Sequence, residues 1–191
     1  MTAFAAIRHH DAASTSGFAI LHGSFAPEGC VVRLDGFARS SSEAVAQPMK
    51  AFDSPARVFD SSDDAVAAIE SGRVRACDTV IVRHDDDTVK ADLSAITAAL
   101  AIAGLDRVTV ITDGRVGGHD GAIIGHVAPS SSARGPIAYV QDDDIIHIDI
   151  AARRIDIMAD IDMRRASKAI RPGKIAFGAG ALDKYNRLFG A

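Results

Sequence analysis

The chain of 191 residues has only two cysteines, Cys30 and Cys77, and no tryptophan. Two thiolates are too few for the three or four ligands that an iron–sulfur cluster usually takes, so this chain alone is not expected to hold one. Each cysteine stands beside a turn-forming residue. We expect both to be reduced, buried and small apolar side chains rather than partners in a disulfide.

Long apolar runs and an excess of basic charge are also missing. No apolar run approaches the roughly 20 residues of a membrane-spanning helix, and the first residues lack the apolar core of a secretory signal. The net charge of −4 gives no field that attracts nucleic acid or an anionic membrane. The sequence therefore predicts a cytoplasmic protein with neither kind of partner.

The chain has the apolar content to fill one core, at 48%. Residues 1–16 are polar and alanine-rich and predict an N-terminal arm, followed by one domain over 17–191. Helices are expected at about 62–71, with Ser61 as N-cap, and at 93–103. A third helix is expected to begin at Asp160 or Asp162. Short strands are expected at 18–21, 31–34, 57–59, 79–83, 108–112, 137–140, 145–150 and 155–158.

This pattern favours a β-rich α+β or barrel-like domain, with a doubly wound α/β fold as the alternative. Residues 141–144 are predicted to form a hairpin turn between two of the strands. The serine-rich segment 38–51 is predicted to be a surface loop. The cluster at 84–87 is predicted to be a solvated loop, with metal binding as the alternative.

The most informative segment is a glycine-rich loop that follows the strand at 108–112. It carries Asp113, Arg115 and His119, with glycines at 114, 117, 118 and 121. Glycines leave backbone N–H groups unshielded, which suits the capture of a carboxylate or phosphate. The spacing matches neither the dinucleotide-binding nor the P-loop pattern closely, and a plain strand connection is the alternative.

Five sequence blocks occur in a characteristic order between residues 17 and 159. They are Leu21-His-Gly-Ser-Phe-Ala-Pro-Glu-Gly29, Ala56-Arg-Val-Phe-Asp60, Ile111-Thr-Asp-Gly-Arg115 with Gly125-His-Val127 after it, Gly135-Pro-Ile-Ala138, and Asp144-Ile-Ile-His-Ile-Asp149. In this order the blocks resemble the C-terminal domain of the dihydroxy-acid dehydratase / 6-phosphogluconate dehydratase family.

The resemblance implies a swivelling β/β/α domain, a compact barrel with flanking helices. It also implies a hydro-lyase reaction in which a proton leaves the carbon next to a carboxylate, a hydroxyl leaves the next carbon, and a 2-oxo acid results. In the family, a larger N-terminal domain supplies the cysteines of an iron–sulfur cluster and most Mg²⁺ ligands. The C-terminal domain closes the site and supplies a serine base and one glutamate ligand.

Carried over by residue, the resemblance implies substrate contacts by Thr112, Asp113, Gly114, Arg115, Gly117 and Gly118. Gly117, however, stands where the family has its serine. Ala91 stands where the family has its glutamate, with Asp92 adjacent. His119 is a candidate substitute base, because its side chain titrates near neutrality by type. No catalytic or metal-binding residue is therefore assigned in this chain.

Other polar residues in these blocks have structural and functional interpretations. Asp113 and Arg115 are expected either to pair or cap the turn, or to orient a ligand or partner domain. His126 is expected to be a structural histidine on a strand. Ser24 replaces the family's asparagine but keeps a hydrogen-bonding group. His22 and Glu28 flank a turn, and we expect their role to be the formation of that turn.

Two functions remain open from the sequence. In the first, the chain is a stand-alone homologue of the C-terminal domain of a dihydroxy-acid or sugar-acid dehydratase, incomplete alone. It then depends on an N-terminal dehydratase subunit for the iron–sulfur cluster and Mg²⁺. In the second, it is a non-catalytic module that binds a small hydroxy or oxo acid or another protein. Because a domain cut free of a larger half retains an apolar face, the chain is expected either to form a homo-oligomer or to need a partner.

Overall fold

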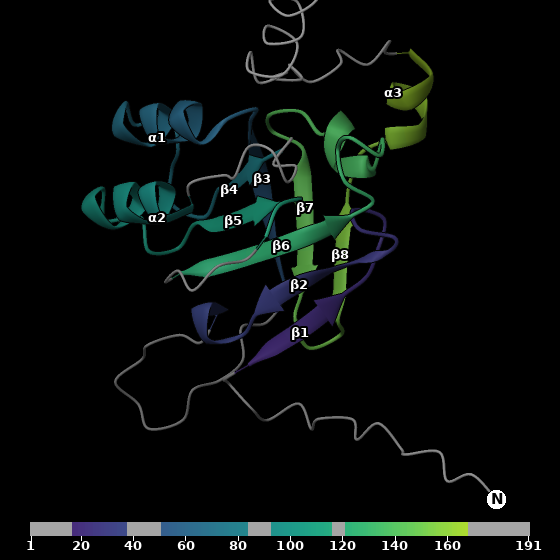
Figure 1. Ribbon diagram of the computed structural model, residues 1–191, viewed down its shortest axis with the longest axis horizontal. Coiled ribbons are helices and arrows are strands. Elements are labelled where there is room, and N and C mark those ends of the chain that lie inside the picture. The colour runs from purple at the N-terminus through teal and green to yellow at the C-terminus, as the bar shows by residue number, and fades with distance from the viewer. Residues whose placement is uncertain (1–16, 38–50, 84–92, 116–120, 168–191) are drawn as a thin grey trace, which may run out of the picture.

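The structure is a computed structural model that describes residues 17–37, 51–83, 93–115 and 121–167. Figure 1 shows strands wrapped into a barrel-like sheet with helices outside it. The strands are β1 Phe18–Leu21, β2 Gly29–Arg33, β3 Phe52–Phe59, β4 Thr79–Val82, β5 Thr109–Thr112, β6 Ala122–Ala128, β7 Ile145–Asp149 and β8 Arg154–Ile157. The α-helices are α1 Ser62–Glu70, α2 Leu93–Ile102 and α3 Ile161–Ser167, and the 3₁₀ helices are η1 Asp35–Phe37 and η2 Pro136–Tyr139.

The sheet has the strand order β1-β2-β6-β5-β4-β3-β7-β8. Its middle, from β3 to β6, is parallel, and both ends are antiparallel. The residue after β1 joins the two edges: the His22 N–H donates to the Arg153 carbonyl at 3.0 Å, and the Ile155 N–H donates to the His22 carbonyl at 3.1 Å. The sheet is therefore a nearly closed barrel.

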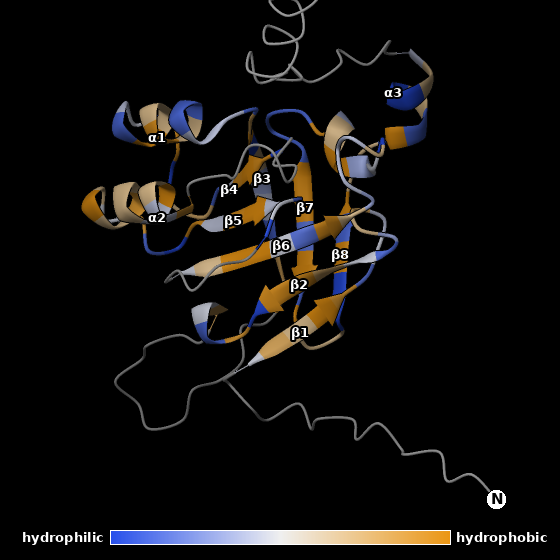
Figure 2. Ribbon diagram, viewed as in Figure 1, coloured by the Kyte–Doolittle hydropathy of each residue, from blue (hydrophilic) through white to orange (hydrophobic). Residues whose placement is uncertain are grey.

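The central strands are buried on both faces and so feed two separate cores. Their side chains alternate in direction. Ile81, Ile111 and Ile124 belong to the core inside the barrel, whereas Val80, Val110 and Ile123 belong to a second core outside it. Figure 2 shows these strands as predominantly apolar. This is why the sequence of these strands shows apolar runs rather than strict alternation.

Helices α1 and α2 lie side by side over the outer core (Figure 1). Helix α1 begins after Ser61, whose Oγ accepts the Asp64 N–H at 3.1 Å, as predicted. Helix α2 ends before Gly104, which has a φ of +68°. Both helices cover the same side of the sheet and the sheet ends are antiparallel, so the fold is the predicted β-rich α+β barrel rather than doubly wound α/β.

Strand β3 is longer than predicted and changes partner midway. Phe52 to Pro55 pair with β7 in antiparallel fashion, and Ala56 to Phe59 pair with β4 in parallel. Pro55 has no N–H and lies where one ladder ends and the other begins, so its missing donor is tolerated. Because proline is rare inside strands, the sequence did not predict the first half of β3.

The predicted strand at 137–140 is wrong. Residues 141–144 do form a turn, in which the Asp144 N–H donates to the Gln141 carbonyl at 3.2 Å, but it is not a hairpin turn because η2 and not a strand precedes it. Residues Pro136–Tyr139 form η2, with Pro136 at the helix start, where its fixed φ is suited. The segment after it is a connection whose aspartates bind other elements. Asp142 accepts the Val58 N–H at 2.7 Å, and Asp144 forms an ion pair with Arg164 of α3.

The two cysteines differ. Cys30 is buried, as predicted, but Cys77 is exposed, in a turn where its φ is +69°. The prediction of a buried side chain at Cys77 is therefore wrong, because the turn into β4 points it outward. The arm at 1–16, residues 38–50 of the predicted surface loop and the cluster at 84–87 lie outside the described residues. None of the helices in the described part of the chain has the length and apolar content that crossing a bilayer requires.

Candidate functional site

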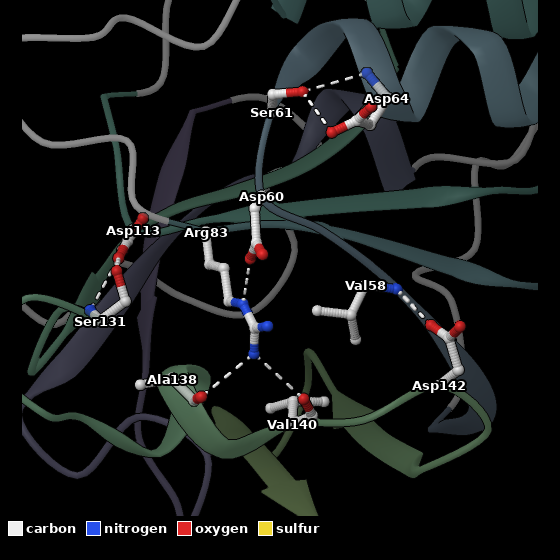
Figure 3. A network of polar contacts seen from close by, with 10 residues as sticks. All are labelled: Val58, Asp60, Ser61, Asp64, Arg83, Asp113, Ser131, Ala138, Val140 and Asp142. Atoms are coloured by element: carbon white, nitrogen blue, oxygen red, sulfur yellow. Dashed lines mark hydrogen bonds and ion pairs between the residues drawn. The ribbon is translucent and has the colours of Figure 1, made fainter. Parts of the chain in front are cut away.

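Three charged residues follow the ends of three adjacent parallel strands. Asp60 follows β3, Arg83 follows β4 and Asp113 follows β5. Because the carboxyl ends of parallel strands meet at one edge of a sheet, these side chains gather there (Figure 3). The carboxyl ends of parallel strands are where ligands bind in open α/β sheets and in β/α barrels alike. We therefore treat the carboxyl edge of β3, β4 and β5 as the candidate site.

Arg83 ties this edge to η2. Its guanidinium donates to Asp60 Oδ1 at 2.6 Å and to the carbonyls of Ala138 and Val140 at 3.0 and 3.2 Å (Figure 3). The planar guanidinium can serve all three acceptors at once, which a lysine cannot do with the same geometry. Arg83 therefore fixes the loop at 129–140 against the ends of β3 and β4.

Asp113 ties the same loop to β5. Its Oδ2 accepts the Ser131 N–H at 2.7 Å and also the Ser131 hydroxyl (Figure 3). Ser131 is buried, so both of these bonds are shielded from water. Asp113 thus caps a turn in the loop after β6, which lies 18 residues further along the chain.

The first turn of the glycine-rich loop is held from inside the protein. The Gly114 N–H donates to Oγ1 of buried Thr112 at 3.0 Å, and the Gly114 carbonyl accepts the His126 N–H at 2.8 Å. His126 has a φ of +53° and lies where β6 bulges against β2. Its imidazole is exposed, while its backbone supports the loop.

The structure brings four of the predicted substrate contacts to this edge: Thr112, Asp113, Gly114 and the exposed Arg115. Gly117, Gly118, His119, Ala91 and Asp92 lie outside the described residues. Sequence reasoning missed Asp60, Arg83 and Ser131 as site residues. A charged residue directly after a buried β-branched strand was the available signal for Arg83, whereas nothing local marked Ser131.

The block around His22 and Ser24 closes the barrel. A Cβ on Gly23 would lie 1.9 Å from the Ile155 carbonyl oxygen, so only glycine allows this close approach. The Ser24 N–H donates to Asp156 Oδ1 at 2.8 Å, and Ser24 Oγ accepts the Ile157 N–H at 3.0 Å. Ser24 thus provides the hydrogen-bonding group expected at this position.

The surroundings of Asp156 favour its charged form. Burial opposes ionisation, but the Ser24 N–H and the Arg154 guanidinium outweigh it, and the pKa of Asp156 lies below its usual value. The clasp between the turn after β1 and β8 is therefore a charge-assisted one.

The described residues do not fit an iron–sulfur cluster. Cys30 lies in the barrel core, where burial raises the pKa of its thiol to about 12, and its Sγ donates to the Leu21 carbonyl. A cluster ligand must be a thiolate, so a neutral buried thiol is unsuited. In the described part of the chain, no three His, Cys, Asp or Glu side chains gather in a way that could hold a metal ion.

This nearly closed barrel with flanking helices is the β-rich α+β architecture that the sequence blocks implied. A family model described as "Dihydroxy-acid/6-phosphogluconate dehydratase C-terminal" matches residues 6–191. The chain belongs to this family.

Among its relatives are proteins named dihydroxy-acid dehydratase. The one from Ruminiclostridium cellulolyticum is 40% identical over 181 residues, which is 92% of this chain and 31% of the relative. The one from Pyrococcus abyssi is 38% identical over 180 residues, with the same two shares. The one from Methanothrix thermoacetophila is 41% identical over 179 residues, 90% of this chain and 31% of the relative. The chain thus spans less than a third of the length of these relatives.

Proposed function

We propose that this chain acts as the acid-binding, site-closing domain of a dehydratase-type assembly and does not dehydrate a substrate alone. The ligand is a small 2-hydroxy or 2-oxo acid. Its carboxylate binds at the carboxyl edge of β3, β4 and β5, where Arg115 supplies positive charge and the amides of Gly117 and Gly118 supply donors.

The observation that carries the proposal is the rigid support at this edge. Arg83 and Asp113 attach the loop at 129–140 to the strand ends from which the glycine-rich loop departs. A binding loop needs such support, since its donors must be held in place before the ligand arrives. The Gly114 N–H already donates to Thr112, so the donors proposed for the ligand lie later in the loop.

The absence of dehydration by this chain alone rests on its chemical groups. Gly117 has no side chain to take the proton that the family's serine is thought to take. Ala91 cannot bind Mg²⁺. Cys30, as a buried neutral thiol, is not a cluster ligand. The cluster and Mg²⁺ are accordingly proposed to come from a partner that corresponds to the remainder of the relatives' length.

A second function is favoured by the same replacements at Gly117 and Ala91. In this alternative, the chain is a module that binds a small acid or another protein without taking part in any dehydration. The cytoplasmic location expected from the sequence remains a prediction under both functions.

Complementation distinguishes the two functions. The N-terminal part of the Ruminiclostridium cellulolyticum relative, up to the start of the region it shares with this chain, is loaded with its cluster and mixed with this chain. Formation of 2-oxo acid from 2,3-dihydroxy-3-methylbutanoate supports the site-closing function. An inactive mixture supports the module, provided that the relative's own C-terminal domain restores activity. A Gly117→Ser variant of this chain tests whether the missing serine alone is responsible.

A further inference from the structure

A groove of about 520 Å³ lies between α2 and the outer face of β5 and β6. Its helical wall includes the small residues Thr97, Ala98 and Ala101 together with Leu100, and its floor includes Val110 and Ile123. Small side chains on a helix allow another segment of chain to approach closely. Among the described residues that line the groove, only Asp106 is charged.

Two large apolar side chains are exposed on β1, which β2 separates from β6. On β1, Ala19 and Leu21 belong to the barrel core, so Phe18 and Ile20 point to the outer face. Phe18 is 67% exposed and Ile20 is 55% exposed. Phe18 and Ile20 thus add exposed apolar surface directly after Gly17, where the arm joins the described chain.

The start of the described chain lies near this groove. The Gly17 carbonyl accepts the Leu34 N–H at 2.9 Å. Two residues after Leu34, Gly36 packs so closely on Gly121 that a Cβ on Gly36 would lie 1.9 Å from the Gly121 carbonyl oxygen. Gly121 lines the groove. The residues that precede Gly17 therefore join the fold within a few residues of the groove.

We propose that the N-terminal arm, residues 1–16, lies in this groove with Phe4 and Ile7 as its anchors. These two are the large apolar side chains of the arm after Met1. Arg8 follows them directly and complements Asp106. The ten residues from Ile7 to Gly17 reach about 33 Å when extended, whereas a helix of the length of α2 spans about 15 Å. The arm is thus long enough to run along the groove.

The arm is not the only segment that carries apolar side chains. Residues beyond Ser167 include Leu182, Tyr185 and Leu188, at a spacing typical of one helix face. A second copy of the chain could also present Phe18 and Ile20. The arm is preferred because its attachment point lies beside the groove and its charge matches that of the lining. The two other occupants are outcomes of the test below.

A spin label on the arm tests the proposal in the full-length chain. The label is attached to Ala5→Cys, which keeps both anchors, in a Cys77→Ser background because Cys77 is exposed. We expect the amide signals of Thr97, Ala98, Ala101 and Ile123 to lose most of their intensity. Replacing both anchors with alanine should restore those signals, whereas the Ser14→Ala and Ser16→Ala variants should leave the broadening unchanged. Free spin label added to the unlabelled chain controls for non-specific broadening.

Three results would overturn the proposal. The first is full intensity at these amides with the label on residue 5. The second is broadening of the same amides by a label at Leu188→Cys and not by the arm. The third is broadening that arises only when a spin-labelled chain is mixed with a separate isotope-labelled chain, which would assign the groove to a second copy.

Discussion

The Ser131 N–H donates to Asp113 Oδ2 at 2.7 Å and so joins the end of β5 to the loop after β6. Arg83 holds the same loop from β4, through the carbonyls of Ala138 and Val140. The loop at 129–140 is thereby fixed to the ends of β4 and β5, and the glycine-rich loop begins at the end of β5. Changes at Asp113 or Arg83 are therefore expected to affect both the stability of the barrel and the ligand binding proposed at its edge.

The first prediction concerns Asp113. Asp113→Ala removes the carboxylate that accepts the N–H and the hydroxyl of buried Ser131. We expect the free energy of unfolding to fall by about 1–3 kcal/mol and acid binding to be lost. Urea denaturation and amide shifts on titration with 2-oxoisovalerate measure the two effects. Asp113→Asn keeps one acceptor and should lose less of both; equal losses in the two variants would contradict a capping role.

The second prediction concerns the three hydrogen bonds that the Arg83 guanidinium donates. Arg83→Lys keeps the charge but cannot reach Asp60 and two carbonyls at once, so we expect a loss of about 1–3 kcal/mol in unfolding free energy. Hydrogen exchange should quicken in residues 136–140. Arg73→Lys, at an exposed position after α1, is the matched control and should change little. If both variants match the unchanged protein in stability, Arg83 does not hold this loop.

The third prediction is a pH dependence at the barrel clasp. Because the pKa of Asp156 is below its ordinary value of 3.8, its charged form stabilises the fold above that pH, and this contribution is lost as pH falls through the folded-state pKa. Asp156→Asn should therefore reduce stability at pH 7 by about 1–2 kcal/mol, and the difference should shrink under strongly acidic conditions. Asp162→Asn, whose side chain is 91% exposed, is the control. A difference that stays constant with pH would exclude a charge-assisted clasp.

Much of the fold could be predicted because local signals agreed with the tertiary structure. Ser61 was identified as a cap, and the β-branched runs that became β4 and β5 were identified as strands. The prediction of a strand at 137–140 failed because tertiary contacts decide there. The segment at 137–140 is apolar and strand-like in composition, but Pro136 starts a 3₁₀ turn whose carbonyls bind Arg83. No local pattern reveals an acceptor role for a distant arginine.

The candidate site was predictable in part for the same reason. Asp113 and Arg115 stood out because glycines surround them and a strand precedes them. Ser131 did not, since its role depends on a loop that returns from β6 to the end of β5. Asp60 and Arg83 meet only because β3 and β4 are neighbouring parallel strands, a pairing that a single sequence does not specify.

One titration tests the central claim, which is that this chain binds a small acid at the barrel edge without dehydrating it alone. The purified chain is titrated with 2,3-dihydroxy-3-methylbutanoate, and one NMR sample reports both amide shifts and any 2-oxo acid formed. We expect the amides of Gly117 and Gly118 to move first, with millimolar affinity, since a net gain of about 4 kcal/mol corresponds to that range. No 2-oxo acid signal should appear. Product formed by the chain alone, or amides at this edge that stay unmoved, would contradict the account.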